Sequence, residues 1–79
     1  MRDAKYGKVL LEKKPDAPSD EPCFVLRAQD PLAALAVRYY ADLVEGYLGG
    51  LPGKNRAMNI RDSADVMAAW PHKKPPEGP

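Results

Sequence analysis

The sequence is poor in the residues that most often form covalent cross-links or cross a membrane. It has a single cysteine, which excludes an intrachain disulfide and favours a reducing, cytoplasmic setting. No apolar run approaches the length of about 18 residues that marks a membrane-spanning helix, and the N-terminus lacks the apolar segment of a signal peptide. We therefore expect a cytoplasmic protein that is not bound to a membrane.

The scarcity of reactive side chains argues against catalysis. Cys23 and His72 are the only cysteine and the only histidine, and they lie far apart in the sequence. A Cys/His nucleophile pair needs both groups together, and a zinc site needs several ligands. Asp62 and Asp65 could share a helix face, but ordinary surface carboxylates show the same spacing. We predict a protein that is not an enzyme and that holds no cofactor and no metal.

The chain also lacks a strong charge of either sign. Its 12 Lys and Arg residues face 11 Asp and Glu residues, for a formal net charge of +1. The basic residues are spread along the chain, whereas binding to nucleic acid phosphates requires a basic patch. Nucleic acid is therefore not an expected partner.

The length of 79 residues leaves room for one domain. A chain this short buries only about 60% of its unfolded surface, so a monomeric core would be marginal and we expect a homo-oligomer. Nine prolines lie mostly outside the presumed core. We predict one small α+β domain over residues 1–70 and a proline-rich flexible tail over residues 71–79.

The apolar patterns predict two strands followed by two helices. After a polar lead-in over residues 1–5, residues 6–14 (YGKVLLEKK) and 23–28 (CFVLRA) have strand composition. Residues 15–22 between them are typical of a loop. The simplest arrangement is a two-stranded antiparallel hairpin, which gives the order ββαα. In the second strand, Phe24, Leu26 and Ala28 form the expected core face.

The first helix is predicted from Pro31 to Leu48. Asp30 is a preferred N-cap residue, proline is favoured at the first helical position, and Gly49 and Gly50 provide the stop.

Two apolar stripes run along this helix, and few positions, among them Ala34 and Ala41, are left for water. The first stripe contains Leu32, Leu35, Ala36, Tyr39, Leu43 and Tyr47. The second stripe contains Ala33, Val37, Tyr40, Val44 and Leu48. The last four of these residues would form an exposed patch in a monomer. We expect these four residues to form an oligomer interface, in the simplest case a homodimer.

The second helix is predicted from Arg56 to Trp70, with Asn55 as its cap and residues 51–55 (LPGKN) as the preceding turn. Its apolar positions repeat at intervals of three and four. The expected buried face consists of Ala57, Ile60, Ala64, Val66, Met67 and Trp70.

Five charged residues are candidates for binding a ligand or a partner: Arg27, Asp30, Lys54, Arg56 and Arg61. The last three surround the expected start of the second helix, where free amide hydrogens favour an anion. The alternative is solvated charge with local pairs such as Arg61 with Asp65. Arg27 anchors a carboxylate, such as that of Glu12 or one from a partner subunit, or it binds a phosphate.

The segment 21–33 (EPCFVLRAQDPLA), together with a Tyr-Ala pair in the following helix and MAAW at residues 67–70, resembles small uncharacterised proteins carried by bacteriophages and prophages. Many of these proteins have a similar F-x-L-R-A-Q-D core, which here spans Phe24 to Asp30. The resemblance covers residues 6–44. It implies no activity, cofactor or catalytic residue. It does imply a small accessory protein that acts by binding in the cytoplasm of the bacterial host.

From the sequence we expect a non-enzymatic interaction protein of phage or prophage origin, one that binds and inhibits a host protein such as a defence component. The alternative is a small-ligand or nucleotide-binding protein that sequesters its ligand at an anion site on an oligomer interface. Exposed aromatic patches would favour the first function. A cleft that joins the basic residues across subunits would favour the second.

Overall fold

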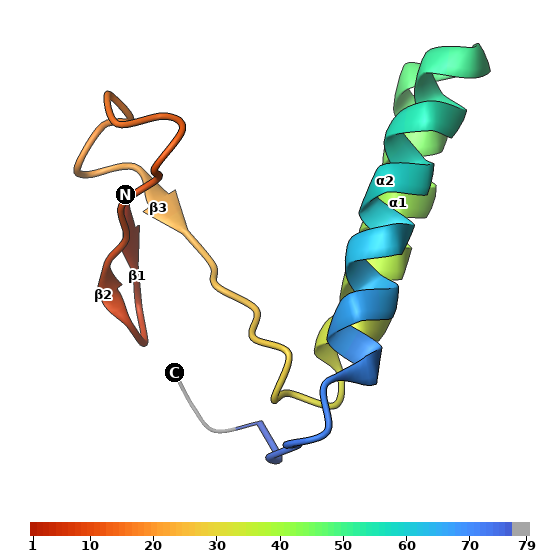
Figure 1. Cartoon of the computed structure of the whole chain (residues 1–79). Helices are drawn as coiled ribbons and strands as arrows, with labels where there is room; N and C mark the ends of the chain where they lie inside the picture. The colour runs from red at the N-terminus through yellow and green to blue at the C-terminus, as the bar shows by residue number, and fades with distance from the viewer. Residues whose placement is uncertain (77–79) are drawn as a thin grey trace.

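The chain forms a small N-terminal sheet and a helical hairpin, connected by an extended segment (Figure 1). The computed structural model describes residues 1–76. In chain order, the elements are β1 (Arg2–Asp3), β2 (Gly7–Lys8), β3 (Pro22–Cys23), α1 (Ala33–Leu48) and α2 (Gly50–Ala69). The predicted α+β class is confirmed, although the sheet has three short strands instead of two longer ones.

The middle strand of the sheet is β1, which the sequence patterns had marked only as a polar lead-in. It pairs antiparallel with β2 and parallel with β3. The two segments predicted to form a hairpin, residues 6–14 and 23–28, therefore do not pair with each other. Each segment instead contributes to a short strand that pairs with β1.

The carboxylate of Asp3 explains this pairing. Asp3 is only 3% exposed. Its Oδ1 accepts hydrogen bonds from the backbone N–H groups of Lys5 and Tyr6, both at 2.8 Å, and its Oδ2 accepts one from Val25 at 2.6 Å. The bonds from Lys5 and Tyr6 shape the turn between β1 and β2, and the bond from Val25 ties the segment after β3 to that turn. The N–H groups of Tyr6, Val25 and Lys5 stabilise the charged form and hold the pKa of Asp3 below its ordinary value.

The apolar side chains beyond these short strands stay largely in solvent. Phe24 is 82% exposed and Leu10 is 78% exposed. The predicted core face of Phe24, Leu26 and Ala28 is wrong, since Cys23 and Val25 are half-buried while Phe24 and Leu26 are exposed. The physical reason is that strand pairing ends at Cys23, so no neighbouring strand supports a continuous face beyond it.

Asp30 bonds to the start of the first helix, but the helix begins later than predicted. Its Oδ1 accepts the N–H of Leu32 at 2.8 Å, and its carbonyl accepts the N–H of Ala33 at 3.1 Å. These bonds make a tight turn through Pro31 and Leu32. The α1 helix itself begins at Ala33 instead of Pro31, with Leu32 at its N-cap position and no side-chain cap bond. The predicted N-cap role of Asp30 is therefore wrong, because its carboxylate closes the turn that precedes the helix.

A single residue, Gly49, joins the two helices. Its φ of 70° and ψ of 169° define a conformation that is essentially restricted to glycine. The second helix begins at Gly50 and ends at Ala69, so the predicted turn at residues 51–55 and the predicted Asn55 cap are wrong. Pro52 is tolerated because it lies in the first turn, where its missing N–H removes no helical hydrogen bond.

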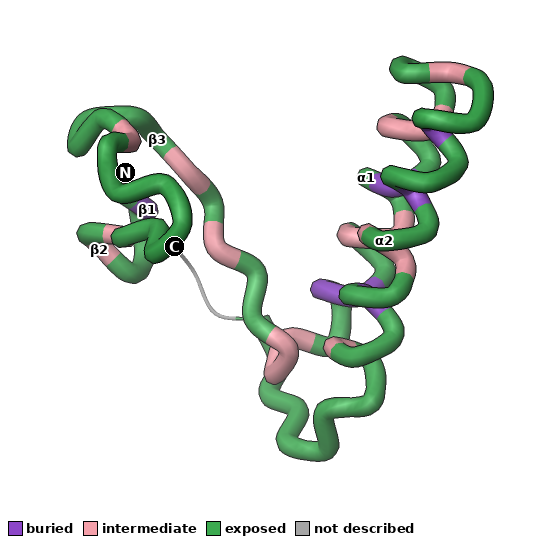
Figure 2. The backbone as a smooth tube through the Cα atoms, turned by 45° about the horizontal axis from the view of Figure 1, so that its top comes forward, coloured by how far each residue is buried: buried purple, intermediate pink, exposed green. Residues whose placement is uncertain are grey.

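Small residues form the contact between α1 and α2. We call this contact the small-residue seam; it consists of Ala33, Ala34, Ala41, Gly53, Ala57 and Ala64, all of them buried. Figure 2 shows buried segments on both helices and at β1. A Cβ atom at Gly53 would lie 2.7 Å from the carbonyl oxygen of Glu45, so the two backbones approach each other too closely for any larger residue.

The seam confirms one predicted helix face and overturns another. Ala57 and Ala64 are buried and Ile60 and Met67 are half-buried, as the spacing of the second helix predicted. Val66 and Trp70 are exposed, because their positions around the helix turn their side chains away from α1. Ala34 and Ala41, which were expected to face water, are buried because α2 packs against the small side chains of α1 instead of its large ones.

The molecule is open for its length. Its radius of gyration is 14.1 Å, whereas a compact chain of this length has about 12 Å. Among the elements of residues 1–76, the helices contact each other and the strands contact each other, but no helix contacts a strand. No large side chain in these residues is fully buried, so the apolar core consists of alanines.

The described part of the tail lies against the segment before α1. The Nζ of Lys73 donates to the carbonyls of Ala28 and Met67, both at 2.7 Å, and the N–H of Lys74 donates to the carbonyl of Gln29 at 2.6 Å. These contacts tie the end of α2 to the segment that leads into α1. The predicted flexibility of residues 71–79 stays a prediction, and residues 77–79 lie outside the described part of the chain.

Two glycines of the hairpin provide a matched test of the seam. Gly46→Ala places its Cβ where no atom beyond the adjacent residues and backbone of its own helix lies within 4 Å, so we expect improved helix propensity to stabilise the fold by up to about 1 kcal/mol. Gly53→Ala forces the helices apart, and we expect a loss of about 1–3 kcal/mol. Urea unfolding followed by circular dichroism measures both free energies. Effects of the same sign would contradict the close approach at Gly53.

The bonds of Asp3 predict a titration at low pH. Because its pKa in the folded state is below the ordinary value of 3.8, its stabilising bonds are present above pH 3.8 and are lost as the pH falls through the lowered pKa. We expect the amide NMR signals of Lys5, Tyr6 and Val25 to shift together, with a midpoint below 3.8.

The variants Asp3→Asn and Asp30→Asn serve as the test and the control. We expect the shared titration to disappear in Asp3→Asn. It should persist in Asp30→Asn, because Asp30 accepts from Leu32 in a different turn. A shared midpoint above 3.8 in the unmodified protein would show that the three donors do not bind the charged carboxylate.

Candidate functional site

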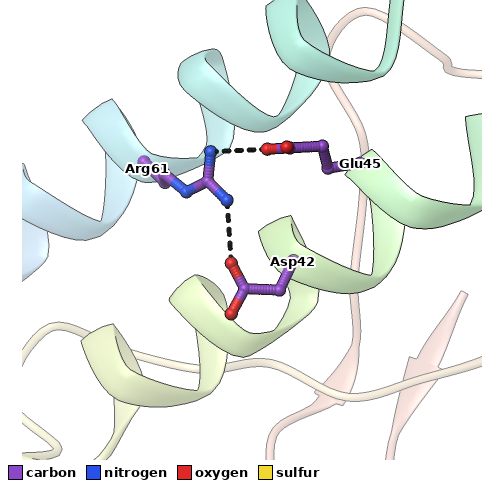
Figure 3. Close-up of polar contacts among 3 residues, drawn as sticks. All are labelled: Asp42, Glu45 and Arg61. Carbon is purple, nitrogen blue, oxygen red and sulfur yellow. Dashed lines mark hydrogen bonds and ion pairs between the residues drawn. The ribbon is translucent and has the colours of Figure 1, made fainter. Parts of the chain in front are cut away.

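The charged side chains of α1 all bind α2. Arg38 Nη2 lies 3.0 Å from Asp65 Oδ1. Arg61 on α2 binds two carboxylates, with Nη2 at 2.8 Å from Asp42 Oδ1 and Nη1 at 2.9 Å from Glu45 Oε1 (Figure 3). Because Arg38, Asp42 and Glu45 are the only charged residues in the α1 sequence, the helix presents no unpaired charge elsewhere on its surface.

The partners of Arg61 differ from the predicted ones. Asp65, proposed from sequence as its local partner, binds Arg38 instead. The carboxylates of Asp42 and Glu45 raise the pKa of Arg61 by accepting its hydrogen bonds. Exposed ion pairs contribute little to stability, but these pairs link the helices at two levels. They therefore help to set the register of the hairpin.

The surface of α1 that points away from α2 is apolar and uncharged. We call it the α1 face; it consists of Leu32, Leu35, Tyr39, Tyr40, Leu43 and Tyr47. Tyr47 is 90% exposed, Tyr39 is 66% exposed and Leu43 is 53% exposed. At 3.6 residues per turn, Leu32, Tyr39 and Leu43 lie opposite to Ala34 and Ala41, whereas Leu35, Tyr40 and Tyr47 lie at the flanks of the face. In the single chain, the large apolar side chains of the α1 face are therefore exposed to water.

The four residues predicted as an oligomer interface divide between two environments. Tyr40 and Leu48 are exposed. Val37 and Val44 are half-buried at the flank of the hairpin. The larger exposed surface comes from the other predicted stripe, which includes Tyr39, Leu43 and Tyr47.

A shallow groove borders the α1 face. Its lining residues are Tyr40, Leu43, Val44, Tyr47, Leu48 and Arg56. Three of the predicted interface residues, Tyr40, Val44 and Leu48, thus meet one predicted binding residue, Arg56. The groove is apolar with one cation among its lining residues, so chemically it suits an apolar side chain that has an acceptor nearby.

The three basic residues expected around the start of the second helix do not form one anion site. Because α2 begins at Gly50, Lys54, Arg56 and Arg61 lie progressively further along the helix and away from its free amides. Arg56 lines the groove just described, whereas Arg61 lines a separate hollow with its two carboxylate partners. Lys54 lines neither.

Arg27 and Asp30 lie together in another hollow, near the sheet. Its lining includes Asp3, Tyr6, Phe24 and the tail residues Lys74, Pro75 and Pro76. The Cζ of Arg27 lies 5.6 Å from the centre of the Tyr6 ring, within the range of a cation–π contact. The ion pair proposed between Arg27 and Glu12 is not formed within residues 1–76.

The only cysteine and the only histidine lie in different parts of the structure, one in the sheet and one in the tail. Cys23 is a half-buried free thiol in β3, and the ring of His72 lies edge-on to Trp70 with 5.5 Å between the ring centres. Residues 1–76 contain no group of three or more His, Cys, Asp or Glu residues that could hold a metal ion. In the same range, neither helix has the length and hydropathy needed to cross a membrane.

Two features that shape the site escaped the sequence analysis. The first is Asp3, although aspartate side chains commonly accept a hydrogen bond from the backbone two residues further on, as Asp3 does from Lys5. The second is the seam. Ala34 and Ala41 are seven residues apart, as are Ala57 and Ala64, and this repeat indicates two helices packed through small side chains. Reading the repeat first would have predicted that the large side chains of α1 face outward.

Comparisons of this chain with protein-family models, curated proteins and solved structures found no match. The α1 face and the groove beside it are left without an apolar partner within the described part of the chain.

Proposed function

We propose that this protein is a non-enzymatic interaction protein that binds another protein chain through the α1 face. The observation that supports it is the high exposure of Tyr39, Leu43 and Tyr47 on a helix whose charges are all engaged with α2. Contiguous exposed apolar patches mark interaction surfaces. Aromatic residues are enriched and charged residues depleted at the centres of protein interfaces, and the α1 face has this composition.

The chemistry of the face favours protein over other partners. Nucleic acid binding requires cations along the phosphate path, and helices that lie on membranes carry lysine and arginine beside their apolar side. Arg56 is the one basic residue that lines the groove. An apolar protein surface is therefore the partner that matches the α1 face.

Association would also supply what the single chain lacks. Burying a leucine or another large apolar side chain contributes about 1.5–3 kcal/mol, whereas each buried CH₂ group contributes about 0.8 kcal/mol. The buried apolar residues of residues 1–76 are all alanines. A partner on the α1 face would therefore bury large apolar side chains, each of which contributes more free energy on burial than an alanine does.

The resemblance to phage and prophage proteins extends the proposal to a setting. It supports an origin in a phage or prophage and a target among the proteins of the bacterial host, such as a defence component that the protein inhibits. This part rests on the sequence core from Phe24 to Asp30, which lies outside the α1 face.

The alternative function, a small-ligand or nucleotide-binding protein, has narrower support. It requires several cations around one site, but Arg27, Arg56 and Arg61 line three different hollows within the chain. A site with several cations would form only in an assembly that brings copies of Arg56 together. Protein binding is accordingly the function that the geometry supports best.

Charge substitutions on matched surfaces test the proposal. The double variant Tyr39→Lys and Leu43→Lys places two charges on the α1 face. The double variant Met58→Lys and Val66→Lys places two charges at exposed positions of α2. We expect the first to abolish association and the second to leave it unchanged, because only the α1 face becomes buried.

Association is measured by light scattering after gel filtration and by capture of host proteins on the immobilised chain, with circular dichroism to confirm folding. We expect the unmodified chain to exceed its monomer mass of 8.7 kDa or to capture a protein that the α1 variant does not. If both double variants match the unmodified protein in both assays, the α1 face is not the binding surface.

A further inference from the structure

We propose that the partner on the α1 face is a second copy of this chain, packed antiparallel about a twofold axis that passes beside the Tyr39–Tyr40 peptide. This inference rests on the proposed function and specifies its first partner. The pairing would place the two α1 helices together at the centre, with an α2 helix on each outer side. The result is a four-helix arrangement in which the small-residue seam lies within each copy and the large side chains lie between copies.

Six outward positions of α1 are symmetric about that peptide, whereas Leu35, which also belongs to the α1 face, lies at its edge and level with the half-buried Val44 of the other copy. Along the centre of the outward surface the residues are Leu32, Ala36, Tyr39, Tyr40, Leu43 and Tyr47. When a second copy runs in the opposite direction, Leu32 lies level with Tyr47 of the other copy, and Ala36 lies level with Leu43. Tyr39 and Tyr40 lie next to the twofold axis, so each of them lies beside its own counterpart in the other copy. A twofold interface requires such a self-complementary row.

The sizes of the paired side chains are complementary. Ala36 and Leu43 point most directly along the centre of this row, by the helical period of 3.6 residues. In the antiparallel pairing, a small side chain therefore faces a large one twice, which lets the helices approach each other without leaving a gap. A parallel pairing would place Leu43 against Leu43 and Ala36 against Ala36, with crowding at one level and a void at the other.

The charges permit self-association. Arg38, Asp42 and Glu45 are occupied by residues of α2 within the same chain, at 2.8–3.0 Å. Two α1 faces can therefore meet without bringing like charges together and without burying an unpaired one. A partner with a charged surface would gain nothing from this face. A second copy is uncharged at every facing position.

The area of the α1 face is sufficient for a dimer. Its three tyrosines and three leucines are each more than half exposed. With aromatic side chains contributing 150–250 Å² each when fully buried, the face can cover on the order of 600 Å² per copy. Specific interfaces cover about 600–1,000 Å² per partner, so the area of the α1 face lies at the lower end of this range.

Cysteine cross-linking distinguishes the directions of packing. All variants carry Cys23→Ser, which removes the native thiol. In the antiparallel dimer, Tyr40→Cys lies beside its counterpart and should form a disulfide-linked dimer under mild oxidation. The two copies of Ala36→Cys would be separated by about 10 Å along the helix, from seven residues at about 1.5 Å each. This separation exceeds the Cα distance of about 7 Å that a disulfide spans.

The decisive comparison uses two single variants, Ala36→Cys and Leu43→Cys. We expect each alone to cross-link at least tenfold less than Tyr40→Cys, and their equimolar mixture to cross-link efficiently, because position 36 of one copy faces position 43 of the other. Non-reducing gels and intact mass measure the yield. A cysteine at the exposed Met58 of α2 serves as the control for random collision and should not form a disulfide-linked dimer.

Other results would overturn this inference in distinct ways. Efficient cross-linking of Ala36→Cys alone and of Leu43→Cys alone would show parallel packing. A monomeric unmodified chain at micromolar concentration, with no cross-linking of Tyr40→Cys above the Met58→Cys control, would exclude the second copy as the partner. In that case, the lysine variants described above still decide whether the α1 face binds a different protein.

Discussion

The close contact of two helix backbones at Gly53 is the constraint on which the hairpin depends. Gly49 reverses the chain within one residue, and Gly53 lets α2 approach the carbonyl of Glu45. A reversal this tight leaves little choice in the faces that meet. Alanines pack in the resulting narrow space because larger side chains would separate the helices. The ion pairs made by Arg38 and Arg61 then bridge the edges of the seam.

The consequence of this packing is an inverted distribution of side chains on α1. In an ordinary helical hairpin, the large apolar residues lie between the helices and the charges face water. Here the charged side chains of α1 bind α2, and Tyr39, Leu43 and Tyr47 face outward. The outward apolar side of α1 is therefore not covered by α2. No other described element contacts the helices.

The N-terminal region depends on a different interaction. The sheet has no large buried side chains, and the Asp3 carboxylate organises it instead. This carboxylate accepts hydrogen bonds from backbone N–H groups in the turn after β1 and from Val25 beyond β3. Hydrogen bonds to a charged acceptor are stronger than those between neutral groups. They therefore matter most in a region such as this one, where little apolar surface is buried. The segment from Phe24 to Asp30 then runs as an extended connection, and Lys73 and Lys74 of the tail bond to its last carbonyls.

The sequence by itself determined the α+β class, the presence of two helices and the buried positions Ala57 and Ala64, because these follow from composition and helical spacing. The excess of apolar residues on α1 was also visible, and with it the expectation of association. Only the tertiary structure decided which face of α1 meets α2, where α2 begins and how β1 orders the sheet. Helical periodicity lists the residues that share a face but does not say which face is covered. That choice was made by the backbone conformation at Gly49, by the space available at Gly53 and by hydrogen bonds of Asp3 to residues up to 22 positions away.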